Sequence, residues 1–290
     1  MLLDRRTEDS QLGAFLMLLR HKEESAEELA GFADAVRSRL HPPALQVDLD
    51  WPSYAGKKRH LPWYLLAAKA LARSGIRILM HGGGLHTAGR LYSEQLLEML
   101  EIPLCSDWPG VADALEQQKL AFIPLGCWMP ELQRMIDLRN ILGLRSPIHS
   151  LARILNPLQA RCGLQSIFHP GYQAVHRDAS QLLGDNVIVI KGEGGEIEVN
   201  PDSACQLLGS SAQGVWSEDW PAMSAQRHVK PERLEPEKLL SVWHGQATDD
   251  YAQQAVTGTM ALALRGLGHS REQALEQARV IWDKRLNRQA

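Results

Sequence analysis

The sequence contains no run of apolar residues long enough to cross a bilayer, the longest being of the size of residues 14–19. No apolar segment with a small-residue cleavage site follows Met1, so we find no secretion signal. Cysteine is sparse, and its spacing is not that of metal ligands: Cys105, Cys127, Cys162 and Cys205. These absences predict a cytoplasmic protein with reduced thiols and no membrane contact.

Acidic residues are missing where basic ones gather. Residues 51–93 hold no Asp or Glu but seven Lys and Arg, and residues 132–177 hold six Arg against the single acid Asp137. Together the two windows carry a net charge of +12, so the remainder must carry −15 for the chain to total −3. Positive charge concentrated in this way indicates a site for a polyanion, either nucleic acid or a phosphorylated small molecule. The alternative is that basic helix faces cluster by chance.

The hydrophobic pattern predicts an α/β fold, with a small helical domain and a larger domain built on a mostly parallel sheet. Ser25 and Glu28 form a capping box ahead of a helix at 29–40. Strands are predicted at 45–49, 76–80, 121–123 and 187–190, and helices at 61–74, 93–100, 172–183, 249–264 and 270–286. Residues 130–155 read as helical, and 209–235 as a polar surface loop. The predicted helical domain is 1–43 completed by about 127–150; 44–126 and 151–290 form the α/β domain.

Several segments, read together, resemble glycosyltransferase family 3, which includes the anthranilate phosphoribosyltransferases and pyrimidine nucleoside phosphorylases. The matching stretches lie in the family's order along nearly the whole chain: 11–20, 80–82, 142–145, 156–158, 168–170, 192–195 and 260–264. The resemblance implies the family's nucleoside phosphorylase/phosphoribosyltransferase-like fold. The chain begins about one helix later than the family pattern, which a truncation or a misplaced start codon would explain.

The chain departs from the family where the resemblance would place the chemistry. The family holds the diphosphate of magnesium-bound phosphoribosyl pyrophosphate on a Gly-Thr-Gly-Gly-Asp turn, where free N–H groups face the anion. Here that turn, residues 52–60, keeps only Gly56 and is followed by a basic run. The family's Asp-Glu metal pair appears as Ile197-Glu198. Because a hard cation needs several oxygen ligands, we expect no metal and no cofactor; the alternative is Mg²⁺ with phosphoribosyl pyrophosphate.

The combination Pro-Ser-Tyr-x-Gly and a basic run is similar to a TrpD-like branch, typified by the YbiB protein, that binds DNA and RNA. The resemblance implies a homodimer formed through the helical domain. It also implies that His81, Gly82 and Arg139 correspond to residues of the family's substrate cleft. Nucleic-acid contacts are predicted for seven basic residues: Lys57, Lys58, Arg59, Arg90, Arg139, Arg145 and Arg153. We predict no catalytic residue, and we place His81 in a strand-end turn with no acid near it in the sequence.

The leading hypothesis is a nucleic-acid-binding protein that contacts the phosphate backbone of single-stranded DNA or RNA with weak sequence preference and is not an enzyme. One alternative is a phosphoribosyltransferase of the anthranilate type, and another is a scaffold that meets an acidic protein. The hypothesis expects residues 57–59 to form an exposed turn at a helix start, replaceable without harm to folding. It expects that turn to share one groove with Arg139, Arg145 and Arg153.

Overall fold

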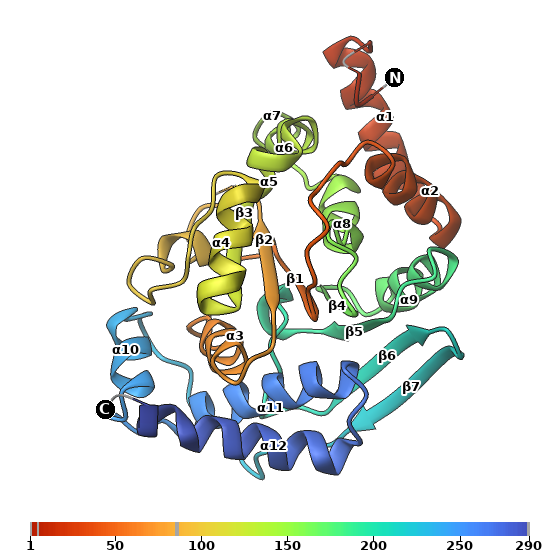
Figure 1. Cartoon of the computed structure of the whole chain (residues 1–290). Helices are drawn as coiled ribbons and strands as arrows, with labels where there is room; N and C mark the ends of the chain where they lie inside the picture. Colours follow the sequence, from red (N-terminus) through yellow and green to blue (C-terminus); the bar gives the residue numbers. More distant parts are fainter. Residues whose placement is uncertain (1, 5, 85–86, 289–290) are drawn as a thin grey trace.

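The computed structural model describes residues 2–4, 6–84 and 87–288 and is organised around a seven-stranded sheet (Figure 1). The strand order is β3-β2-β1-β4-β5-β6-β7. Five strands are parallel: β1 (Leu49–Ser53), β2 (Ile78–Gly82), β3 (Leu120–Pro124), β4 (Cys162–Ile167) and β5 (Val187–Lys191). The hairpin β6 (Cys205–Ser211) and β7 (Gly214–Trp220) adds to β5 in antiparallel fashion. The predicted α/β class with a mostly parallel sheet is therefore confirmed.

Helices cover both faces of the sheet, because alternate residues of a buried strand point to opposite sides. Ile78 and Met80 pack into one apolar core, whereas Leu79 between them packs into the other. The first core is covered by α3 (Tyr64–Arg73), α10 (Glu237–Trp243), α11 (Asp250–Gly266) and α12 (Arg271–Lys284). The second is covered by α4 (Trp108–Gln118), α5 (Leu125–Trp128), α8 (Ile148–Leu151) and α9 (Tyr172–Leu182).

The N-terminal helices pack against the middle of the chain, as predicted. Leu12 of α1 (Asp9–Lys22) and Leu29 of α2 (Ala26–Arg37) share the second core with Leu132 of α6 (Pro130–Asp137), next to α7 (Arg139–Leu142). An ion pair of 2.7 Å between Arg134 Nη1 and Asp9 Oδ1 joins α6 to α1. The Ser25–Glu28 capping box is present at the start of α2. The same core continues onto the sheet, so the division into two domains stays a prediction.

Three local predictions are wrong. Much of the expected loop at 209–235 belongs to the β6–β7 hairpin; in β7, partly buried residues alternate with exposed ones, the pattern of a half-buried strand. The expected helix at 93–100 is a single 3₁₀ turn, Ser93–Gln95. The expected strand at 45–49 begins only at Leu49, since its ladder partner Ile78 opens β2.

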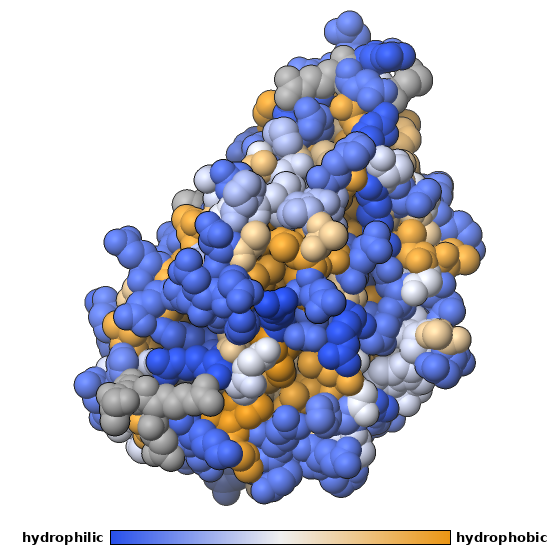
Figure 2. Space-filling view, in the orientation of Figure 1, coloured by the Kyte–Doolittle hydropathy of each residue, from blue (hydrophilic) through white to orange (hydrophobic). Residues whose placement is uncertain are grey.

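Hydrophilic residues cover most of the face drawn in Figure 2, and hydrophobic residues show only in patches between them. Within the described ranges, no helix combines the length and the apolarity that crossing a bilayer demands.

Candidate nucleic-acid interface

The strand order creates a crevice at the carboxyl ends of β1 and β4. The chain leaves β1 toward β2 on one side of the sheet, whereas β4 continues to β5 on the other. Ligands of open α/β sheets bind at such a switch point. The β1–β4 ladder pairs Leu49 with Cys162 and Asp50 with Gly163, although both strands continue further. The loops that follow these strands therefore have room to form a site.

A cavity of about 800 Å³ lies at the carboxyl end of β4, lined by the segments after β2 and β4, by the end of α1 and the residues after it, by residues 139–153 and by α9. Five arginines line it, each from a different segment: Arg20 at the end of α1, Arg90 after β2, Arg139 at the start of α7, Arg145 before α8, and Arg153 in the 3₁₀ turn Ala152–Ile154. Glu23 and Glu24 are the only carboxylates among its described lining residues. We call this the arginine cavity. The predicted convergence of Arg139, Arg145 and Arg153 on one groove is confirmed, and Arg90 joins them.

The arginines in the cavity destabilise one another's charges. Burial, together with the positive charges of Arg153 and Arg90, lowers the pKa of Arg145 to about 10. Burial likewise lowers the pKa of Arg153. Repulsion between like charges at a half-buried site raises the free energy of the ligand-free protein, and an anion bound among them reduces this repulsion.

Two of the five arginines are held in place by backbone carbonyl groups. Arg153 Nη1 donates to the carbonyl oxygens of Ser166 and Gly195, the latter at 2.9 Å. Arg90 Nη1 donates to the carbonyl oxygen of Gly56 at 2.9 Å. These bonds tie Arg90, after β2, to the loop after β1, and Arg153, before β4, to β4 itself and to the loop after β5, so the guanidinium positions are set by the backbone. Arg20 is exposed and Arg145 only half-buried, which leaves both accessible from solvent.

An aromatic surface borders the positive charge. Phe168 is 53% exposed and packs edge-to-face against His169, with ring centroids 5.0 Å apart. Tyr172, at the start of α9, lines the same cavity. Rings beside cations form the combination on which single-stranded nucleic acids bind, because bases stack on the rings while phosphates meet the charges.

Lys57 departs from the prediction of an exposed basic turn. Its side chain is buried, and its Nζ lies 2.6 Å from Glu198 Oε1. Helix α3 begins only at Tyr64, so the basic run lies in a loop and not at a helix start. A buried carboxylate requires a counter-charge, and Lys57 supplies it. As the chain is folded here, Lys57 is therefore corrected from a phosphate contact to a structural partner.

Lys58 and Arg59 are exposed, but they are not among the described lining residues of the arginine cavity. The single-groove prediction is therefore wrong for this turn. Their contact with nucleic acid stays a prediction, outside the cavity itself.

His81 and Gly82 lie inside β2 and are buried, so they do not line the cavity with Arg139. His81 Nε2 is 3.2 Å from Asp50 Oδ1 on the adjacent strand, and its Nδ1 is 2.8 Å from the Tyr54 hydroxyl. The expectation of a strand-end turn was wrong, since His81 lies within β2, and the neighbouring strand β1 brings Asp50, distant in the sequence, next to its ring. A Cβ at position 82 would lie 2.6 Å from the Ser53 carbonyl oxygen, so only glycine fits there.

The residues present do not fit magnesium phosphoribosyl pyrophosphate. Glu198, in the position of the family's metal pair, has both oxygens engaged: Oε1 by Lys57 and Oε2 by the Tyr64 N–H at 2.9 Å. The described residues contain no group of three or more His, Cys, Asp or Glu side chains that could hold a metal ion. The N–H groups of Ala55 and Gly56, in the family's diphosphate turn, both donate to Glu196.

The sequence pattern missed Arg20, Phe168 and Tyr172. Arg20 stands beside acids in an N-terminal helix, outside both basic windows, so no local charge pattern marks it. Phe168 and Tyr172 flank a Pro-containing turn, and an isolated aromatic residue near such a turn is ordinarily interpreted as a packing residue. Only the meeting of α1, α9 and the loop after β4 around one cavity reveals them.

Comparison with known proteins gives a consistent picture. Residues 1–40 match the glycosyl transferase family helical bundle domain. The uncharacterized protein YbiB of Escherichia coli is 26% identical over 212 residues, covering 71% of this chain and 66% of that protein. An anthranilate phosphoribosyltransferase of Anaeromyxobacter is 28% identical, covering 64% of this chain and 56% of the relative. The matched regions thus span less than two thirds of these relatives.

Solved structures extend the likeness to the whole chain. The anthranilate phosphoribosyltransferase TrpD of Thermus thermophilus superposes with a TM-score of 0.70 at 22% identity, covering 99% of this chain and 92% of that one. The Saccharomyces cerevisiae enzyme in complex with PRPP and Mg superposes with a TM-score of 0.75 at 17% identity, covering 99% and 85%. The chain therefore has the TrpD-like α/β fold of glycosyltransferase family 3.

Proposed function

We propose that this protein binds single-stranded DNA or RNA in the arginine cavity, using a phosphoribosyltransferase-like scaffold without its metal and donor chemistry. The observation that carries the proposal is the convergence of five arginines, from five segments, on a cavity with two lining carboxylates. Guanidinium groups bind phosphates bidentately and stay charged at neutral pH. Contacts to phosphate carry no base information, so sequence preference is weak.

The alternative of a phosphoribosyltransferase is less well supported by the same residues. A transferase of the family type needs a metal-bound diphosphate, whereas Glu198 is held by Lys57 and the turn amides are held by Glu196. A site that lacks the metal-binding acids but retains its arginines favours an anion whose phosphates bind the arginines directly, without a metal ion. Fold likeness alone does not assign a function.

The direct test replaces Arg139 and Arg145 together with alanine and titrates the protein with fluorescent single-stranded oligonucleotides of unrelated sequence. We expect binding to weaken by the same factor for every sequence, and the salt slope of log K to fall by about 1.4, which is roughly 0.7 for each lost phosphate contact. The matched control is Arg134→Ala with Arg161→Ala. It removes the same charge, but these arginines pair with Asp9 and Asp48 away from the cavity. Equal losses in the two variants would refute a cavity-specific site.

A second test concerns the single-strand preference. Phe168→Ala should weaken binding of single-stranded oligonucleotide about tenfold, because a base stacked on an aromatic ring contributes on the order of 1–3 kcal/mol. Duplex binding should change little, since paired bases are stacked on one another. The measurement is the ratio of the two Kd values in parent and variant. A variant with an unchanged ratio would remove Phe168 from the interface and leave the arginine proposal standing.

We also propose that the protein forms a homodimer through the N-terminal helices. Large apolar side chains are exposed on two adjoining elements there: Leu18 of α1 is 69% exposed and Ile141 of α7 is 82% exposed. A Cβ placed on Gly13 of α1 would lie 3.5 Å from the Leu142 side chain, so the two helices touch. Leu18→Asp with Ile141→Asp should yield a monomer in sedimentation velocity. A parent chain that is monomeric at high concentration would contradict the proposal.

A further inference from the structure

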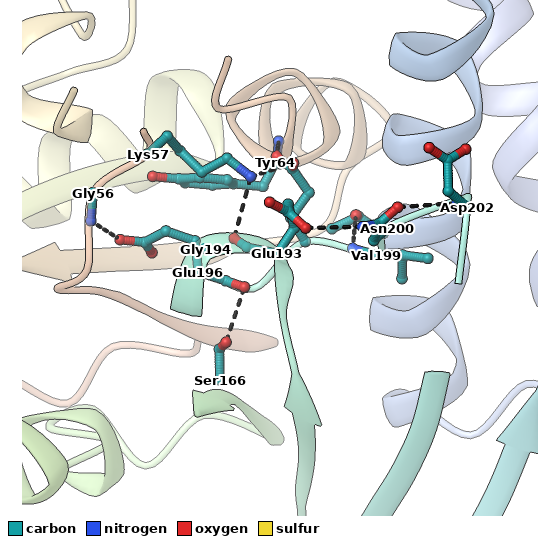
Figure 3. Close-up of polar contacts among 12 residues, drawn as sticks. Gly56, Lys57, Tyr64, Ser166, Glu193, Gly194, Glu196, Val199, Asn200 and Asp202 are labelled. Carbon is teal, nitrogen blue, oxygen red and sulfur yellow. Dashed lines mark hydrogen bonds and ion pairs between the residues drawn. The ribbon is translucent and has the colours of Figure 1, made fainter. Parts of the chain in front are cut away.

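The turn after β1 holds an anion that belongs to the protein itself. The backbone N–H groups of Ala55 and Gly56 both donate to one oxygen, Glu196 Oε1, at 2.6 and 2.7 Å. Figure 3 shows the bond from Gly56. Glu196 is 1% exposed, and Gly56 has φ +68°, a conformation that favours glycine. Successive N–H groups converging on one point form a concavity that binds anions.

The surroundings of Glu196 show how strongly this turn is built for negative charge. Glu196 Oε2 is buried and has no hydrogen-bond partner in the part of the chain that the structure describes. Burying a carboxylate with one unsatisfied oxygen costs free energy, so an apolar side chain of similar volume would be more stable at this position if it only had to fill space. Arg90 holds the carbonyl oxygens of Ala55 and Gly56, and Arg153 holds that of Gly195, which keeps both loops in place around the carboxylate.

The neighbouring cation completes the arrangement. Lys57, the next residue of the turn, places its ammonium on Glu198, two residues beyond Glu196. The loop after β5 thus supplies one carboxylate to the turn amides and a second to the turn lysine. The turn amides and the turn lysine are therefore both bound to carboxylates of the same chain.

We propose that residues 55–56 form a phosphate-binding cradle that the protein keeps filled with the Glu196 carboxylate, so that a free phosphate group enters only when this carboxylate is removed. The cradle is distinct from the arginine cavity: Ala55, Gly56 and Glu196 are not among that cavity's described lining residues. The inference explains how a chain with this fold excludes a diphosphate donor by its own side chain.

The test compares Glu196→Ala with Glu196→Gln, using inorganic pyrophosphate without metal as the probe. Both variants lose the same charge and keep the arginine cavity, so any non-specific gain in anion binding is equal in the two. Glutamine retains an oxygen for the two N–H groups and keeps the cradle filled, whereas alanine empties it. Titration calorimetry should show one additional pyrophosphate site per chain in Glu196→Ala, and the same stoichiometry for Glu196→Gln and the parent.

A second variant and a second measurement protect the test against misfolding. Glu196→Ser also empties the cradle but leaves a small polar group, and its melting temperature should rise with pyrophosphate more than that of Glu196→Gln. The proposal is overturned if pyrophosphate raises the melting temperatures of the Ala, Ser and Gln variants equally. It is also overturned if pyrophosphate stabilises neither the Ala nor the Ser variant. Because oligonucleotide binding is measured separately, either result leaves the proposed nucleic-acid function to stand or fall by its own experiment.

Discussion

Raising the salt concentration will release single-stranded oligonucleotide from this protein. If about four phosphates are neutralised, log K should fall with log[salt] with a slope of roughly −2.8, so affinity should drop about 50-fold between about 50 and 200 mM salt. The reason is that each arginine–phosphate contact displaces a counterion from the strand. The charges concerned are those of the arginine cavity, where Arg145 and Arg153 repel each other in the free protein.

The salt titration is best made by fluorescence anisotropy on oligonucleotides of equal length and different sequence. All should give the same slope, because the phosphates are the same in each. Repeating the titration with the Arg134/Arg161 control variant should reproduce the parent slope. Affinity that hardly changes over this salt range would exclude a polyanion site in the cavity, whatever the absolute Kd.

Replacing Lys57 with alanine will destabilise the fold. The side chains of Lys57 and Glu198 are 1% and 0% exposed and are joined at 2.6 Å. Removing one partner of a buried pair leaves an uncompensated charge, which costs on the order of 3–5 kcal/mol of unfolding free energy. Urea denaturation at neutral pH measures the loss. Lys58→Ala is the matched control, since Lys58 is the exposed neighbour and should leave stability unchanged.

The loss should depend on pH in a definite direction. Burial raises the pKa of Glu198, and Lys57 and the Tyr64 N–H oppose that rise. Without Lys57 the folded-state pKa rises further above the unfolded value of about 4.3. A raised carboxyl pKa favours folding below the unfolded value, and this contribution is lost as the pH rises through the folded value. Lys57→Ala should therefore be closest to the parent in acid and furthest from it at alkaline pH.

A double variant separates charge from packing. Lys57→Met with Glu198→Gln removes both charges and keeps similar volumes, and it should recover most of the stability lost in Lys57→Ala. A stable Lys57→Ala protein would show that the pair contributes nothing, and would restore the expectation that the whole 57–59 run can be replaced without harm. Lys58 and Arg59 are exposed, as that expectation requires, whereas Lys57 is buried.

Local sequence chemistry determined much of the framework. The Ser25–Glu28 capping box fixed the start of α2, because its two side chains satisfy the N–H groups of that same turn. Apolar segments bounded by turns indicated β2, β3 and β5, and helical spacing indicated residues 130–155. The two acid-poor windows indicated a polyanion site, since net charge is a property of composition. The β6–β7 hairpin was not predicted, because in β7 the acid Glu218 lies on the half-buried face and the apolar Val215 on the exposed one, which breaks the alternation expected of a strand.

Only the tertiary structure decided which charges are available to a ligand. Lys57 and Lys58 are adjacent in sequence, yet one neutralises Glu198 141 residues away and the other faces solvent. Arg20 lies outside every basic window, yet it enters the cavity because α1 packs beside α6 and α7. The acid beside His81 comes from strand pairing with Asp50, and the anion in the β1 turn comes from Glu196. Sequence sets the number of charges, whereas long-range pairing decides their counter-charges, because a buried charge must find a partner wherever the fold supplies one.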